Sequence, residues 1–216
     1  MLRIVLILVT SLSLNILFAQ QYCESRPNLN SIFTDANYAM IKEVILNGDN
    51  DNINNNTALD TFDLYEDYTA ITNADITEGE TYTISVTLDG YASGQGSGNS
   101  TNNSGAKIYI DYNMNGDFTD SGEEIGIVPY RYWNDAQDYT IGVPELINFT
   151  VPNNNGFYGT TRMRIVSQYR SDQNSNLIGP CDAPTGFSAP WYGATEDYTV
   201  TINQGTGCAT TFSKDI

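Results

Sequence analysis

The amino-acid sequence predicts an all-β protein, an antiparallel and jelly-roll-like β-sandwich of seven to nine strands. Its 216 residues include 15 Tyr and 18 Gly, and only 16% are charged. Tyrosine suits half-exposed strands, and glycine and asparagine suit the turns that join them. Short stretches of alternating hydrophobicity recur between turn signals, and no helical pattern extends beyond two turns. Together these observations favour two packed β-sheets.

Expected strands in the first half of the chain are separated by polar turns. The first is expected over 39–46, although a helical turn also fits this stretch. Residues 47–56 are expected to form a polar loop, because Asn, Asp and Gly tolerate left-handed backbone conformations. Further strands are expected over 63–71 and over 81–89, where apolar residues alternate with Thr and Ser.

The second half begins with a Gly-, Ser- and Asn-rich stretch at 90–105, which is typical of a flexible loop. A strand is expected to begin at Lys107, where apolar and polar residues alternate again. The remaining strands are expected at 146–152, 161–169 and 195–202.

Residues 1–19 have the pattern of a secretory signal peptide. One positive charge is followed by an apolar run broken by polar residues and then by Ala19. The run is too short and too interrupted for a membrane span, so we expect a secreted or cell-surface protein without membrane insertion. Removing this leader takes away one arginine and no acid, so the net charge of −17 becomes −18. Such an acidic protein repels nucleic acid and attracts cations.

A calcium-binding loop is predicted after the strand that begins at Lys107. Oxygen-bearing side chains recur at alternate positions around Gly116, in the pattern D-x-N-x-N-G. Calcium takes six to eight oxygen ligands, which a short loop supplies when alternate residues turn inward. The predicted ligands are Asp111, Asn113, Asn115, Asp117, Asp120, Glu123 and Glu124.

The match to a helix–loop–helix calcium loop is partial. The twelfth position, where a bidentate glutamate is expected, is Gly122, and Glu123 comes one residue late. The alternative is an Asn- and Asp-rich turn whose side chains bond their own backbone.

The same tetrapeptide, Glu-Asp-Tyr-Thr, occurs at 66–69 and at 196–199. Carboxylates brought together by neighbouring strands repel each other unless a cation or an arginine lies between them. A second acidic site is therefore possible at Asp67, Glu196 and Asp197. The alternative is that Arg162 or Arg164 pairs with these acids.

An aromatic cluster gives the second functional hypothesis, a carbohydrate-binding module. Aromatic rings with a polar edge suit the faces of a saccharide. The candidate residues are Tyr130, Tyr132, Trp133, Tyr139 and Trp191. Catalysis has little support, because the chain has no histidine, and we expect no enzyme activity.

Three cysteines remain after the leader, namely Cys23, Cys181 and Cys208. Export favours a disulfide, but the residues alone allow three pairings. No Cys/His cluster is present that would suit zinc.

Several short segments follow one another along the chain, at 22–23, 68–69, 81–86, 110–120, 151–152, 161–164, 181 and 193–202. Together they resemble the GEVED domain of secreted Bacteroidota proteins. In the namesake motif this chain has Gly193-Ala194-Thr195-Glu196-Asp197-Tyr198, so the first glutamate is replaced by alanine and the Glu-Asp pair is kept.

The resemblance implies a domain over residues 20–204, followed by a linker or the start of a further domain at 205–216. It also implies a noncatalytic β-sandwich module, often one part of a longer protein associated with type IX secretion. By the family pattern Cys23 pairs with Cys181. We therefore expect a calcium-stabilised module for adhesion or scaffolding at a bacterial surface, with a surface protein or a glycan as its partner.

Overall fold

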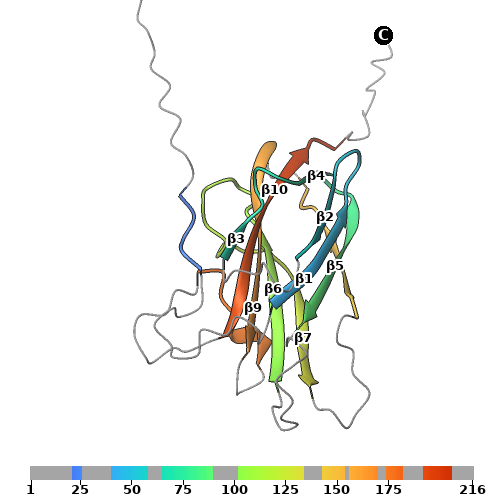
Figure 1. Ribbon diagram of the computed structural model, residues 1–216. Helices are drawn as coiled ribbons and strands as arrows, with labels where there is room; N and C mark the ends of the chain where they lie inside the picture. The colour runs from blue at the N-terminus through green and yellow to red at the C-terminus, as the bar shows by residue number, and fades with distance from the viewer. Residues whose placement is uncertain are drawn as a thin grey trace, which may run out of the picture.

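The structure, a computed structural model, describes residues 21–25, 40–57, 65–89, 102–133, 143–153, 156–169, 174–181 and 192–205. Ten strands in these ranges form two sheets that pack face to face (Figure 1). The predicted all-β sandwich is confirmed, with ten strands where seven to nine were expected. The predicted signal peptide and residues 206–216 lie outside the described part of the chain.

The four-stranded sheet has the order β2-β1-β5-β8, and all of its neighbours are antiparallel. Its strands are β1 (Met40–Asn47), β2 (Asn52–Asn56), β5 (Thr81–Asp89) and β8 (Glu145–Thr150). The prediction of a loop throughout 47–56 was wrong, because 52–56 pair with β1 and bury Ile53 opposite Leu46. One buried isoleucine between exposed asparagines is enough to place this strand at the sheet edge.

The six-stranded sheet has the order β3-β10-β9-β6-β7, and β4 pairs with β10 as well. Its strands are β3 (Tyr65–Asp67), β4 (Asn73–Thr77), β6 (Asn102–Ile110), β7 (Glu124–Trp133), β9 (Gly159–Tyr169) and β10 (Tyr192–Asn203). Both β3 and β4 run parallel to β10. The sheet is therefore mixed, and β10 has β9 along one edge and two short strands in succession along the other.

The main core lies between the two sheets. Val44 and Ile84 face it from the four-stranded sheet, and Ile108, Ile165 and Val200 face it from the six-stranded sheet. Burying each such side chain contributes about 1.5–3 kcal/mol. Because neighbouring residues of a strand point to opposite faces, the residues next to Ile108 and Ile165 face away from this core.

A smaller core lies on the outer face of the six-stranded sheet. It contains Tyr109, Phe118, Val166 and Ile178, with Tyr22 and Cys23 packed against it. The segment 21–25 and the segment around the 3-10 helix η2 (Ser175–Leu177) therefore cover this face together.

A disulfide joins these two covering segments. Cys23 and Cys181 are bonded, with their Cα atoms 5.3 Å apart, as the family resemblance predicted. In the described residues no helix is long and apolar enough to span a bilayer.

Candidate functional site

The predicted calcium loop connects β6 to β7 and is anchored by Asp111. The Asp111 carboxylate is fully buried and accepts hydrogen bonds from the backbone N–H groups of Asn115 (3.2 Å) and Gly116 (2.9 Å). It also accepts one from the Tyr22 hydroxyl at 2.8 Å. Gly116 has a φ of 87°, which suits glycine and lets the loop bend sharply.

Three exposed or half-exposed side chains meet at the tip of this loop. The amide nitrogens of Asn113 and Asn115 both lie 2.7 Å from one carboxylate oxygen of Asp120. Asp117 points elsewhere, because its carboxylate accepts from the backbone N–H groups of Phe118 and Thr119. The loop thus gathers part of the predicted ligand set and uses the rest as turn caps.

Glu123 completes the loop from the other end. Gly122 has a φ of 95° and turns the chain, so that Glu123 points inward and is 2% exposed. Its carboxylate accepts from the backbone N–H of Tyr112 (3.1 Å) and of Asp120 (3.3 Å). Burial, followed by repulsion from the Asp111 carboxylate, raises the pKa of Glu123 to about 7.

Glu124 lies on β7 outside this group. Its carboxylate forms an ion pair with the Lys107 ammonium at 2.8 Å. Within the described ranges, no three His, Cys, Asp or Glu side chains are close enough to hold a metal ion in this conformation. The loop nevertheless contains the donor types that suit a hard cation, because two buried carboxylates lie close together and amide side chains lie beside them. In this conformation the amide oxygens of Asn113 and Asn115 accept from the backbone N–H groups of Asn115 (3.1 Å) and Asp117 (2.8 Å).

The second predicted acidic site is divided between the two faces of the six-stranded sheet. Strands β3 and β10 lie side by side, with Asp67 paired to Asp197 and Glu66 to Glu196. Asp197 is fully buried on the outer face, whereas Asp67 is exposed and accepts from the backbone N–H and hydroxyl of Thr69. The three candidate acids therefore do not form one site.

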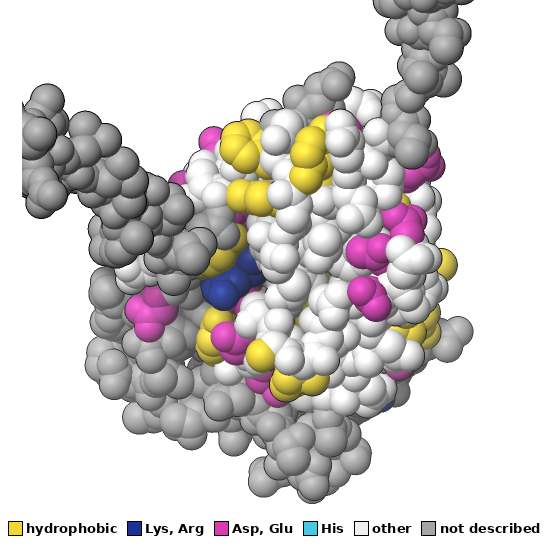
Figure 2. Space-filling view, turned by 90° about the horizontal axis from the view of Figure 1, so that it is seen from above, with side chains coloured by type: hydrophobic (Ala, Val, Ile, Leu, Met, Phe, Trp, Pro, Cys, Tyr) yellow, Lys and Arg dark blue, Asp and Glu magenta, His cyan; other side chains and the backbone are white. Residues whose placement is uncertain are grey.

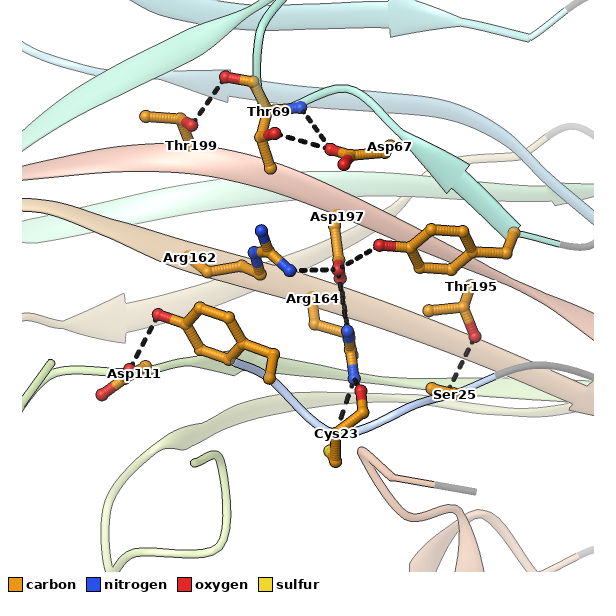
Figure 3. Close-up of polar contacts among 12 residues, drawn as sticks. Cys23, Ser25, Asp67, Thr69, Asp111, Arg162, Arg164, Thr195, Asp197 and Thr199 are labelled. Atoms are coloured by element: carbon orange, nitrogen blue, oxygen red, sulfur yellow. Dashed lines mark hydrogen bonds and ion pairs between the residues drawn. The ribbon is translucent and has the colours of Figure 1, made fainter. Parts of the chain in front are cut away.

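Asp197 is held by arginines, as the alternative interpretation predicted. Arg164 donates to both of its carboxylate oxygens at 2.7 Å, and Arg162 adds a third bond at 3.1 Å (Figure 3). The Tyr65 hydroxyl donates a fourth at 2.8 Å. Bidentate arginine–carboxylate pairs of this kind are among the strongest polar contacts in proteins.

Arg164 also connects Asp197 to the disulfide. Its NH1 group donates to the carbonyl oxygens of Cys23 (2.8 Å) and Pro180 (2.9 Å). The cluster thereby joins β9, β10 and both segments that cover the outer face.

Glu196 lies on the opposite face of β10, in a polar cluster that the sequence reasoning did not identify. Its carboxylate accepts from the hydroxyls of Tyr198 (2.5 Å) and Thr57 (3.2 Å). Burial is the largest cause that raises the pKa of Glu196 to about 8, and the negative charge of Glu66 adds to it. The repeated tetrapeptide contains both glutamates, but the register of β3 and β10 is what places Glu66 beside Glu196.

The aromatic cluster is described only in part. Tyr130 is half-buried, packs against the smaller core, and donates from its hydroxyl to the carbonyl oxygen of Gln168 at 3.0 Å. Tyr132 and Trp133 lie on β7, but their side chains are outside the described part of the structure, as are Tyr139 and Trp191. Of the five candidates, Tyr130 is therefore the one whose side chain the structure describes.

Two comparisons with known proteins, a search of curated proteins and a scan against family models, give different results. The search of curated proteins finds no match to the chain. The family scan matches the part of the sequence that includes the disulfide partner Cys181 and the Glu196-Asp197 pair. Residues 105–201, from β6 into β10, match the family model of the GEVED domain.

Proposed function

We propose that the protein is a noncatalytic extracellular module whose loop between β6 and β7 binds one calcium ion, and that it serves in adhesion or scaffolding at a bacterial cell surface. One observation carries the calcium part of this proposal. The loop holds two like-charged buried carboxylates, Asp111 and Glu123, beside a tip where amide and carboxylate groups converge.

A calcium ion in this loop would relieve an electrostatic conflict. Two adjacent buried carboxylates repel each other, and this repulsion disfavours ionisation of Glu123. A divalent cation would supply the opposite charge, with Asp111, Glu123 and Asp120 as acidic ligands and the amide oxygens of Asn113 and Asn115 as neutral ones.

Calcium binding would stiffen more than the loop itself. The Asp111 carboxylate accepts a hydrogen bond from Tyr22, and its backbone bonds to Arg162 and Thr161 of β9. A bound ion would therefore fix the junction of β6, β9 and the segment 21–25.

The noncatalytic role is supported by the way in which the Glu-Asp pair of β10 is used. Asp197 is held by two arginines and a tyrosine, and Glu196 is hydrogen-bonded inside the sandwich. Export to the surface of a bacterium, by a route such as type IX secretion in Bacteroidota, is supported by the leader-like residues 1–19 and by the family resemblance. Its partners there would be a surface protein, a glycan or other domains of a longer chain.

The calcium part is tested by thermal unfolding of the mature protein in calcium and in EDTA. At a calcium concentration a hundredfold above Kd, binding to the folded state stabilises it by about 2.7 kcal/mol. For a domain of this size that corresponds to a rise in Tm of roughly 5–10 °C. Isothermal titration should give one ion per chain.

The matched variants are Asp120→Asn in the loop and Glu80→Gln outside it. Both remove one exposed carboxylate, so they change the net charge equally. Asp120→Asn should abolish most of the calcium-dependent rise in Tm, and Glu80→Gln should leave it intact. Equal Tm values of the unmodified protein in calcium and in EDTA would contradict calcium binding, and the loop would then be an Asn- and Asp-rich turn. Calcium-dependent retention of the protein on intact bacterial cells tests the adhesive role.

A further inference from the structure

A small polar pocket opens beside the Asp197 cluster, at the end of the sandwich shown in Figure 2. It has a volume of about 270 Å³ and is lined by Tyr22, Thr69, Thr160, Thr161, Arg162 and Thr199. Figure 2 shows Lys or Arg side-chain atoms (dark blue) in a hollow on this face, with hydrophobic (yellow) and acidic (magenta) side chains next to them. The lining thus consists of four hydroxyls, one aromatic ring and one guanidinium.

The guanidinium of Arg162 is fixed in place on two sides. Its NH1 group donates to Asp197, and its central carbon lies 4.3 Å from the centroid of the Tyr22 ring. Tyr22 is itself fixed, because its hydroxyl bonds to Asp111 and its ring stacks on Phe118 at 4.9 Å. The Arg162 side chain remains 24% exposed, so this fixed cation has an edge open to a ligand.

Asp197 alone does not neutralise Arg162, because Arg164 already engages both oxygens of that carboxylate. Asp67 is a second acid close enough for the charges of both guanidinium groups to act on it. Asp67, on the rim near Thr69, has one oxygen occupied by two donors from that threonine. Among the residues that line the pocket, Arg162 is charged and no acid is present.

Most of the threonine hydroxyls can act only as acceptors toward a ligand. Thr161 donates to the carbonyl oxygen of Asp111, and Thr199 donates to that of Thr69. Thr69 donates in turn to the carboxylate of Asp67. Because each hydroxyl has a single hydrogen, the oxygens of these three threonines are left to accept hydrogen bonds from a ligand's own hydroxyl groups.

We propose that this pocket binds a carboxylate with neighbouring hydroxyl groups, which is the chemistry of a uronic acid residue of an acidic polysaccharide. The planar guanidinium fork matches a carboxylate, and the threonine oxygens match the adjacent hydroxyls. The volume lies just below the range of about 300–1,000 Å³ that is typical of pockets for drug-sized molecules, which suits one sugar residue. The residues that line the pocket include no predicted calcium ligand and no member of the predicted aromatic cluster.

The test is titration of the mature protein with glucuronate, galacturonate, glucose, acetate and a short Glu-rich peptide, followed by calorimetry and by amide chemical shifts. Both uronates should bind, with shifts at Thr160 and Thr161, and should bind at least tenfold more tightly than glucose or acetate. Binding should persist in EDTA, which separates this proposal from calcium binding.

Arg162→Gln should weaken uronate binding at least tenfold, and Arg162→Lys should weaken it less because the charge is kept without the fork. Lys42→Gln, which removes a cation from the other sheet, is the matched control and should bind normally. Thr160→Val provides a second variant, since this side chain is exposed and lines the pocket, and it should weaken uronate binding without affecting acetate binding.

Three results would overturn the proposal. They are the absence of uronate binding by the folded protein, equal binding of acetate and uronate, and tighter binding of the Glu-rich peptide than of either sugar acid. If Arg162→Gln fails to fold, Thr160→Val and the chemical shifts still decide between these outcomes.

Discussion

Arg164 and Arg162, which lie two residues apart on the same face of β9, both contact Asp197, yet their positions give them different roles. The Arg164 side chain is almost fully buried and makes bonds to Asp197, Cys23 and Pro180. Arg162 is partly exposed and makes one bond to Asp197. The first arginine therefore holds the outer face together, whereas the second is available to a ligand.

Replacement of Arg164 by methionine should destabilise the protein by about 3 kcal/mol, because removing one partner of a buried ion pair leaves the other charge uncompensated. Arg162→Met should cost less than about 1 kcal/mol, as is usual for partly exposed pairs. Urea unfolding of both variants measures the difference. Equal losses would contradict the assignment of the structural role to Arg164.

The buried Glu196 should make stability depend on pH in an unusual direction. Its pKa is raised from an ordinary value near 4.5 to about 8 in the folded protein, so the folded state holds a proton that the unfolded state releases. Stability is therefore fully present below about pH 4.5 and falls as the pH rises to 8.

Glu196→Gln should remove most of this slope, because glutamine cannot ionise. Unfolding in urea and EDTA at pH 5, 6.5 and 8 would measure it, at roughly 1.4 kcal/mol for each unit of pKa shift. Glu123→Gln should remove only the contribution of Glu123 to the pH dependence of stability, which lies between about pH 4.5 and 7. If the slope of the Glu196→Gln variant matched that of the unmodified protein, the assignment to Glu196 would be wrong.

At the scale of the elements, strands in which apolar and polar residues clearly alternate could be predicted from the sequence, and strands without this alternation could not. The predicted strand at 81–89 coincides with β5. Its apolar and polar residues alternate because one face of the strand packs on the core and the other does not. Strand β2 has one apolar residue, Ile53, among asparagines, and this composition is also that of a loop. What distinguishes it is pairing with β1, and pairing depends on tertiary contacts that the local sequence does not encode.

The same limit applies to the candidate site. The loop at 111–124 could be located from its spacing, and the arginine–aspartate pairing could be named as an alternative. The Glu66–Glu196 pair could not be assigned, because it requires knowing that β3 lies parallel to β10 and in register with it. Neither could the pocket at Arg162, which forms only where β9, β10 and segment 21–25 meet.

If β2 is a structural strand, Ile53→Ala should destabilise the protein by about 2–5 kcal/mol, because Ile53 is fully buried in the main core. The matched variant is Asn54→Ala, whose side chain is exposed on the same strand. It should change the free energy of unfolding by less than about 0.5 kcal/mol. Similar effects of the two variants would indicate that 52–56 is a loop after all.

At the scale of the whole molecule, the disulfide links the segment before the first strand to the segment before the last. Cys23 and Cys181 are separated by 158 positions, so the bond closes a loop that contains every strand except β10. Such a closed loop restricts the unfolded chain.

Replacement of both cysteines by serine should therefore lower the free energy of unfolding by about 2–5 kcal/mol. Denaturation of the double variant and of the unmodified protein, with and without reductant, measures this. The reductant should have no effect on the double variant. A double variant as stable as the oxidised protein would show that the bond adds nothing to the packing of the two segments.

The same bond determines how the molecule would respond to mechanical tension. If the chain is pulled on the N-terminal side of Cys23 and the C-terminal side of β10, the force passes from Cys23 directly to Cys181. The strands between the two cysteines lie outside this covalent load path, and β10 carries the tension along its length while it remains paired with β9, β3 and β4. Reduction would release about 550 Å of additional contour length, from 158 residues at about 3.5 Å each. If the protein has the adhesive role proposed above, the intact disulfide limits how far it can be stretched between two surfaces.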